Sequence, residues 1–306
     1  MNSQKQPHKR KAAVFPTDPA EHSQKIAEAV AEAWHRAYGS ERIEIAVSVL
    51  AILALIAPDG DEALAFAEAH LLKGDAQKFV EFARLQWAIF VRARPDLAPR
   101  AWPLIEPWHG KDPIDGPVLE AAKQVSDAAV RSGQLHLTGN RRRRETDLFG
   151  VVLTTLRSGR ATAARGQYYT PRSVTDLMVQ LLGPPQEGES VLEPTAGTGG
   201  FLRSTAEAMR AAGRDPATVS WWAVDIDDLA IACLAVNAVL WELGPKVILG
   251  VADSLIDDWT DRALTERNNA ISTARTLDAT SKALRLLELV GPSTAHEPDV
   301  PNQAPH

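Results

Sequence analysis

The sequence contains only one cysteine, Cys233, among its 306 residues. A single cysteine excludes an internal disulfide and a cysteine-rich zinc site, and it is typical of proteins in reducing compartments. We therefore expect a cytoplasmic protein without a metal centre.

Long apolar runs are missing too. The most apolar stretch, residues 45–57, is shorter than the roughly 18 to 20 residues that a membrane-spanning helix needs, and Glu44 precedes it. We expect this stretch to form a buried core helix. The basic start of the chain leads into Pro16 and Asp18 instead of an apolar segment, so a signal peptide is not predicted. Residues 1–19 are expected to form a disordered tail.

An overall positive charge is also absent, because the formal net charge is −6. This argues against a protein coated with positive charge for nucleic acid, although a local positive field can still exist. Basic residues concentrate between Arg131 and Arg172, with four in a row at Arg141, Arg142, Arg143 and Arg144. These four side chains either attract DNA phosphates or form a solvated linker, and the pattern alone leaves both open.

The apolar residues that are present, 45% of the chain, suffice for two domains with cores of their own. Residues 20–150 show mainly helical periodicity, which predicts a helical N-terminal domain. Within it, residues 95–117 contain six prolines. We expect an irregular segment there, with Trp102 and Trp108 packed against the domain.

The pattern changes after Ser190, where short apolar runs begin to alternate with helical stretches. The predicted strands are residues 190–192, 219–224 and 247–251, and the helices between them are residues 200–212 and 228–243. This alternation is typical of an α/β fold with a doubly wound parallel sheet.

We therefore expect a partial Rossmann-like domain over residues 160–260. A helical pattern follows over residues 261–290 and predicts a terminal helix. The proline-rich residues 291–306 lack periodicity and are expected to be disordered.

A glycine-rich loop, Glu193 to Leu202, directly follows the first predicted strand and opens a helix. In such a sheet a ligand lies beyond the carboxyl end of the strand, and glycines let the backbone approach it. A dinucleotide fingerprint counted from Gly197 would need a small residue where Leu202 stands, so a nicotinamide cofactor is disfavoured. The acidic Glu193 suits the ammonium group of S-adenosylmethionine, while loop N–H groups can meet its carboxylate. The alternative is a glycine-rich turn without a ligand. The candidate contacts in this loop are Glu193, Thr195, Gly197, Gly199, Gly200 and Phe201.

The second and third predicted strands also end in acidic residues. Asp225 can accept hydrogen bonds from both ribose hydroxyls, and the neighbouring Ile226 can pack on the adenine ring. Asp253, followed by Ser254, can accept from the exocyclic amine of the adenine. The alternatives are helix-capping or solvated aspartates, and Asp227 and Asp228 are expected to cap the following helix.

These motifs resemble those of DNA adenine-N6 methyltransferases, and in particular the modification subunit of type I restriction-modification systems. The loop Glu193-Pro194-Thr195-Ala196-Gly197-Thr198-Gly199-Gly200-Phe201 is similar to the family's Asp-Pro-x-x-Gly-Thr-Gly-Gly-Phe. Upstream, residues 166–171, Gly-Gln-Tyr-Tyr-Thr-Pro, are similar to the family's Gly-x-Phe-Phe-Thr-Pro. The resemblance implies S-adenosylmethionine as cofactor, with Tyr169, Thr170 and Pro171 as further contacts.

The resemblance ends before catalysis. The family's Asn-Pro-Pro-Phe motif, which grips the target adenine after base flipping, is not found in the sequence. No catalytic residue is therefore assigned, and the strand carrying Glu193 is expected to form an open edge. The terminal helix, a second copy of the chain or a separately encoded catalytic half could cover this edge.

Two functions follow as hypotheses. The chain is either the cofactor-binding part of a DNA adenine-N6 methyltransferase that needs a partner, or an inactive relative that binds S-adenosylmethionine or DNA. The resemblance also implies that a separate specificity subunit recognises the DNA sequence. Alone, the chain is not expected to methylate DNA.

Overall fold

The computed structural model describes residues 15–157 and 172–290. The tails predicted for residues 1–19 and 291–306 lie mostly or wholly outside these ranges. Tyr169, Thr170 and Pro171, which were predicted to contact the cofactor, also lie outside the described residues. We call residues 15–157 the helical region and residues 172–290 the sheet region.

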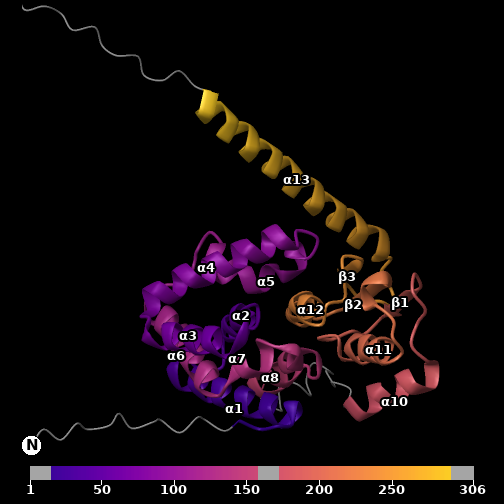
Figure 1. Ribbon diagram of the computed structural model, residues 1–306, viewed down its shortest axis with the longest axis horizontal. Coiled ribbons are helices and arrows are strands. Elements are labelled where there is room, and N and C mark those ends of the chain that lie inside the picture. Colours follow the sequence, from indigo (N-terminus) through magenta and orange to yellow (C-terminus); the bar gives the residue numbers. More distant parts are fainter. Residues whose placement is uncertain (1–14, 158–171, 291–306) are drawn as a thin grey trace, which may run out of the picture.

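The helical region forms a bundle around the apolar helix α2 (Figure 1). Every residue of α2 from Ile45 to Ala54 is buried, which confirms the predicted core helix. None of the helices in the described residues is long and apolar enough to cross a membrane. The helices of this region are α1 (Pro19–Ala37), α2 (Ile43–Ala54), α3 (Gly60–Lys73), α4 (Ala76–Ala93), α5 (Ala98–His109), α6 (Gly116–Arg131), α7 (Gln134–Thr138), the 3-10 helix η1 (Arg141–Arg144) and α8 (Leu148–Leu156).

The prediction of an irregular segment over residues 95–117 is wrong, because α5 lies within it despite Pro103 and Pro107 in its interior. Each internal proline removes one backbone hydrogen bond. However, the helix buries a stripe at helical spacing that includes Leu104 and Trp108, and this packing outweighs the lost bonds. Trp108 also donates to the Ser48 Oγ atom at 2.7 Å. Trp102 lies on the opposite side and is 45% exposed, so only one of the two tryptophans packs as expected.

The sheet region confirms the predicted α/β class. Three parallel strands are ordered β1-β2-β3, with Glu193 paired to Ala223 and Asp225 paired to Val251. The elements of this region are α10 (Arg172–Leu182), β1 (Ser190–Glu193), α11 (Gly200–Ala211), the 3-10 helix η2 (Pro216–Thr218), β2 (Ser220–Asp225), α12 (Asp228–Leu240), β3 (Val247–Val251) and α13 (Thr260–Val290).

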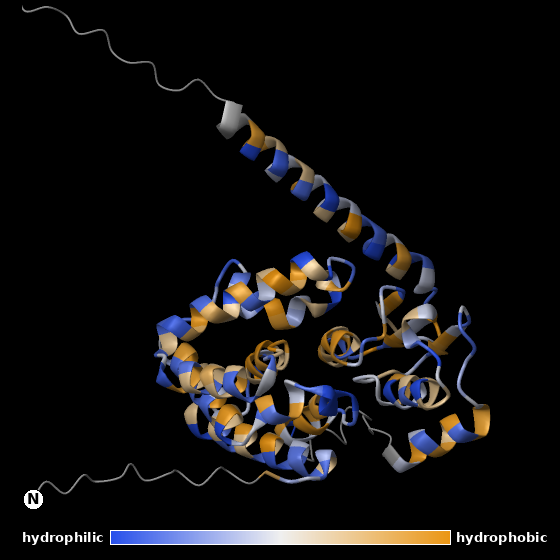
Figure 2. Ribbon diagram, in the orientation of Figure 1, coloured by the Kyte–Doolittle hydropathy of each residue, from blue (hydrophilic) through white to orange (hydrophobic). Residues whose placement is uncertain are grey.

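Helix α12 joins the two regions. It lies between the sheet and the helical region and packs against α5 (Figure 1). Every residue from Leu229 to Ala238 is buried, and Figure 2 shows α12 and α2 as the helices with the most apolar colouring at the centre of the molecule. A helix that is apolar all round needs cover on all sides. One continuous core therefore includes residues of both regions.

The two edges of the sheet differ. Along β3 the outward carbonyls of Val247, Leu249 and Val251 accept hydrogen bonds from Arg267, Arg100 and Arg262, respectively. Two of these arginines belong to α13, which packs along β3 and then extends away from the body (Figure 1). The expectation that this helix could cover the strand with Glu193 is therefore wrong. Strand β1 forms the other edge, as predicted, and its Leu192 is 60% exposed.

Candidate cofactor-binding site

The glycine-rich loop leaves β1 as a turn built on Glu193. The Oε1 atom of Glu193 accepts from the Thr195 backbone N at 3.3 Å and from the Thr195 Oγ1 at 3.2 Å. The other carboxylate oxygen, Oε2, has no partner among the described residues. Glu193 therefore shapes the start of the loop and can still accept hydrogen bonds from a ligand. Phe201, at the other end of the loop, packs against the main core.

Asp225 ties this loop to the second strand. Its Oδ2 atom accepts from the Gly197 backbone N at 2.7 Å, and its Oδ1 atom accepts from the Asp227 backbone N at 2.9 Å. A carboxylate offers about four acceptor positions, so these two bonds leave room for ribose hydroxyls. Ile226 follows directly and is 72% exposed. The structure thus brings the loop and the predicted ribose ligand into direct contact.

Two adjacent glycines of the loop have different reasons to be glycine. Gly199 has a φ of 95°, and a Cβ there would collide with Leu234 and lie 3.0 Å from the Trp241 ring. Gly199 is therefore required by core packing. A Cβ on Gly200 would meet nothing within 4 Å. Of the two glycines, Gly200 is the one at which an added side chain would extend into open space beside the loop.

Asp253 lies beyond the end of β3, at the same edge of the sheet. Its Oδ1 atom accepts from the Leu255 backbone N at 3.0 Å, while its own backbone N donates to Asp257 at 3.1 Å. Ser254 is half-buried beside it. Because the strands are parallel and in register, the ends of β1, β2 and β3 place Glu193, Asp225 and Asp253 along one edge.

A polar cluster that the sequence did not reveal holds the loop from the helical region. Asp147, the N-cap of α8, accepts from the Thr198 hydroxyl through Oδ2 and from Asn237 Nδ2 at 3.0 Å through Oδ1. Asn237 also donates to the Thr198 carbonyl oxygen at 2.9 Å. Burial raises the pKa of Asp147, although the hydrogen bonds from Thr198, Gly150 and Asn237 oppose this shift. The sequence can indicate that Asp147 caps the apolar helix α8. It cannot indicate that Asp147 contacts Thr198.

A second connection joins α8 to the start of α12. The Arg157 guanidinium forms a two-bond ion pair with Asp227, including one bond of 3.1 Å to Oδ1, and the two side chains are only 5% and 7% exposed. Asp227 also accepts from the Leu229 backbone N at 3.2 Å, which confirms the predicted helix cap. The capping residue is therefore held by the helical region as well.

The four consecutive arginines form η1, and three of them contact other parts of the chain. Arg143 donates to Glu242 Oε1 at 2.8 Å, and Arg144 pairs with Oε2 of the same residue. Arg142 donates to the backbone oxygens of Pro16 and Thr17. Arg141 is the most exposed of the four. Three of the predicted phosphate contacts thus have intramolecular partners.

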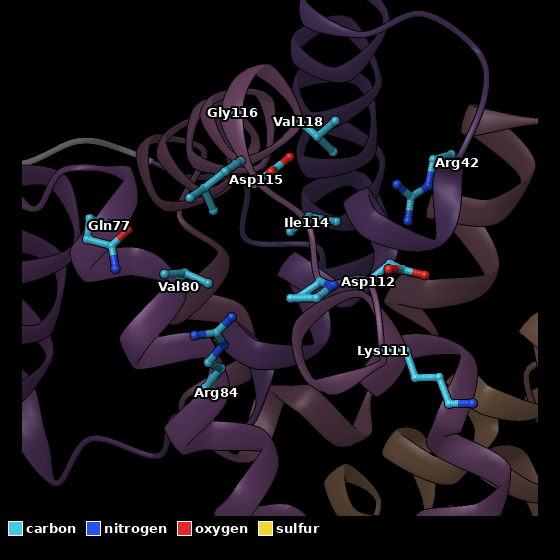
Figure 3. Close-up of a pocket in the computed structure, with 12 residues that line it drawn as sticks. Arg42, Gln77, Val80, Arg84, Lys111, Asp112, Ile114, Asp115, Gly116 and Val118 are labelled. Carbon is cyan, nitrogen blue, oxygen red and sulfur yellow. The ribbon is translucent and has the colours of Figure 1, made fainter.

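A hollow of about 660 Å³ in the helical region is separate from the loop. Arg42, which precedes α2, and Arg84, from α4, lie on different sides of it (Figure 3). Asp112 and Asp115 also line the hollow, so its charges are mixed. None of the predicted cofactor contacts that fall within residues 15–157 and 172–290 lines it.

Comparisons with known proteins agree with the motif analysis. Residues 144–275 match the family model described as N-6 DNA Methylase. The chain is 33% identical over 93 residues to the type I restriction enzyme MjaIX methylase subunit of Methanocaldococcus jannaschii, covering 30% of this chain and 16% of that protein. It is 44% identical over 59 residues to the type I restriction enzyme EcoEI methylase subunit of Escherichia coli, covering 19% of this chain and 12% of that protein.

The matched stretches are therefore less than a fifth of the length of these two relatives. Among solved structures, a modification subunit of a putative type I restriction enzyme from Vibrio vulnificus YJ016 is similar with a TM-score of 0.45 and 17% identity, over 79% of this chain and 58% of that one. The family model covers the glycine-rich loop, the three strand ends and both connections from α8. Residues 144–275, less than half of the chain, thus carry the similarity to the N-6 DNA methylase family.

Proposed function

We propose that the chain binds S-adenosylmethionine at the carboxyl edge of the sheet, as the cofactor-binding part of a DNA adenine-N6 methylation system. The observation that carries this proposal is the hydrogen bond from Gly197 to Asp225, which closes the glycine-rich loop onto the end of β2. The loop can then offer N–H groups to the methionine carboxylate, while Glu193 and Asp225 accept from the ammonium and the ribose.

In this proposal residues 20–150 act as a helical N-terminal domain and residues 160–260 as the cofactor-binding domain. Tyr169, Thr170 and Pro171 complete the cofactor contacts, Asp253 and Ser254 meet the adenine, and Ile226 packs on the ring. The resident compartment is the cytoplasm, as expected from the single cysteine.

The base-binding half of the reaction has to come from outside these elements, since the sequence holds no Asn-Pro-Pro-aromatic motif. The open edge of β1 is the place where it could join the sheet, because an edge strand presents unpaired backbone groups. A further part of the same polypeptide, a separately encoded subunit or a second copy could occupy this edge. A specificity subunit would supply recognition of the DNA sequence.

Calorimetric titration tests the cofactor directly. We expect the folded chain to bind S-adenosylmethionine with a micromolar Kd and to give no heat with NAD. Asp225→Ala should weaken binding by about 1 to 3 kcal/mol, because the ribose hydroxyls lose their acceptor and the loop loses the bond from Gly197 N. Equal binding of both cofactors, or tight binding by the variant, would contradict the assignment.

Methyl transfer distinguishes the two hypotheses for the whole protein. With tritiated cofactor and an adenine-rich duplex, the chain alone should leave the DNA unlabelled, because an acceptor misplaced by even about 1 Å can cost ~100-fold in rate. Labelling only after addition of a subunit that carries an Asn-Pro-Pro-aromatic motif would support the two-part enzyme. Labelling by the chain alone would reveal a base pocket in this sequence.

A further inference from the structure

We propose that Asp147 is a positioning residue for the glycine-rich loop, so that the helical region completes the cofactor site. The inference deepens the proposed function and rests on it for its effect on affinity. It starts from Thr198, the residue between Gly197 and Gly199 in the loop. Thr198 is 1% exposed, and both its hydroxyl and its carbonyl oxygen are hydrogen-bonded to residues outside the loop.

The loop is held by two carboxylates from opposite sides. Asp225, at the end of β2, holds the Gly197 backbone N, and Asp147, at the start of α8, holds the Thr198 hydroxyl. Gly197 and Gly199 both have positive φ angles, 52° and 95°, so the residues on either side of Thr198 are conformationally permissive. The orientation of the loop N–H groups therefore depends on these outside contacts more than on the loop backbone itself.

The first turn of α8 is built to permit this contact. A Cβ on Gly150 would lie 2.6 Å from Asp147 Oδ2 and 2.9 Å from Thr198 Oγ1. Any side chain at this position would separate the two residues. The Gly150 backbone N also donates to Asp147 Oδ1 at 3.1 Å, which fixes the carboxylate. Asn237 of α12 completes the cluster by bonding to both Asp147 and Thr198.

Substitutions of Asp147 and Thr198 differ in how many of these hydrogen bonds they keep. In Asp147→Asn, the amide oxygen can still accept from Gly150 and Asn237, while the amide NH₂ donates to a rotated Thr198 hydroxyl. This variant should keep the loop in place. Asp147→Ala removes every acceptor, and Thr198→Val removes only the hydroxyl while keeping the shape of the side chain. Both should release the loop.

Ser48→Ala provides a structural control in the helical region. Ser48 is buried, and its hydroxyl accepts from Trp87 and Trp108 and donates to the Leu104 carbonyl oxygen. Its loss should lower the melting temperature without touching the loop. A merely structural role for Asp147 would make Asp147→Ala behave like Ser48→Ala.

The experiment combines amide hydrogen exchange of the cofactor-free chain with calorimetric titration of S-adenosylmethionine, well below the melting temperature of each variant. We expect Asp147→Ala and Thr198→Val to speed amide exchange at Gly197 to Gly200 at least about tenfold. The same two variants should weaken binding of S-adenosylmethionine about 10- to 100-fold, where each factor of 10 in Kd corresponds to about 1.4 kcal/mol. Asp147→Asn should stay within about threefold of the parent in exchange rate and in Kd, and Ser48→Ala should change neither quantity.

Unchanged exchange and affinity in Thr198→Val and Asp147→Ala would overturn the positioning role. The same change in all four variants, Ser48→Ala included, would also overturn it, because the effect would then be general destabilisation. If exchange rises as expected but the parent chain binds no S-adenosylmethionine, the positioning role stands and the proposed function fails.

Discussion

Two of the polar junctions that connect the helical region to the sheet region differ in burial. At the first junction, Arg157, the C-cap of α8, meets Asp227 at the start of α12, with side chains that are 5% and 7% exposed. At the second, Arg143 and Arg144 of η1 meet Glu242 just beyond α12, with exposures of 22% for each arginine and 43% for the glutamate. Both junctions join arginine to a carboxylate, so the comparison isolates the effect of solvent.

The difference shows which junction can fix the site. An exposed ion pair is screened by water and contributes about 0 to 1 kcal/mol, whereas breaking a buried pair costs about 3 to 5 kcal/mol because a charge is left without its partner. The buried junction also lies next to the loop, since Asp227 N donates to Asp225. We infer that α8 determines the geometry of the site, while η1 only attaches the segment just beyond α12 to the helical region.

The largest expected effect comes from Arg157→Met. This change keeps much of the side-chain volume but removes the charge that faces Asp227, so the free energy of unfolding should fall by about 3 kcal/mol or more. Urea denaturation measures the loss. A double variant, Arg157→Met with Asp227→Asn, should recover part of it. If the single variant loses no more stability than Glu242→Gln, the distinction between the junctions is wrong.

The next effect concerns the pH dependence at Asp147. Burial raises the pKa of this carboxyl above its ordinary value of 3.8, so the folded state favours the protonated form. The contribution of Asp147 to stability is therefore largest at low pH and declines as the pH rises through the raised pKa. Relative to Asp147→Asn, which does not titrate, the parent chain should lose stability as the pH rises above 4. Thermal melting from pH 3 to 8 tests this, and an opposite slope would contradict it.

Glu242→Gln should have a smaller effect. Burial acts to raise the pKa of Glu242, but the hydrogen bonds and charges of Arg143 and Arg144 outweigh burial and lower this pKa. Its contribution is present above the ordinary glutamate range and is lost as the pH falls through the lowered pKa. Because the pair is partly exposed, we expect a loss of about 0.5 kcal/mol near pH 7, reduced further by salt. A loss above about 2 kcal/mol in urea denaturation would place this junction with the buried one.

The smallest effect is expected for DNA binding by the four arginines. Each phosphate contact contributes about 0.9 to the logarithmic salt slope. Arg141→Gln should reduce the slope by about this amount, and Arg143→Gln should reduce it less, because Arg143 already pairs with Glu242. Fluorescence anisotropy at several salt concentrations provides the slopes. Equal reductions for the two variants would mean that the Glu242 pair opens when DNA binds.

The strands and the helices around them could be predicted from the sequence because their signals are local. The apolar runs that became β1, β2 and β3 lie within two residues of their predicted bounds. The irregular segment was predicted from prolines alone, and it proved to contain α5 because burial of Leu104 and Trp108 depends on partners such as Ser48, far away in the sequence. Local rules give the elements but not their packing.

The candidate site shows the same division. The acidic strand ends and the glycine-rich loop were found from their spacing, but the bond between Asp225 and Gly197 joins residues 28 positions apart, and that between Asp147 and Thr198 joins residues 51 apart. No sequence pattern encodes such distances. Gly199 illustrates the consequence, because the sequence suggested backbone approach to a ligand and the structure gives a packing reason in Leu234 and Trp241.

Gly200 therefore allows the most direct test of cofactor binding at this loop. A leucine at Gly200 meets no protein atom near its Cβ, so Gly200→Leu should fold normally but fill the space where the methionine part of S-adenosylmethionine would lie. Ala211→Leu, at the exposed end of the same helix, is the matched control. Calorimetric titration of both variants should show micromolar binding for Ala211→Leu and no binding for Gly200→Leu, with unchanged melting temperatures. Binding by Gly200→Leu as tight as that of the parent chain would contradict the account.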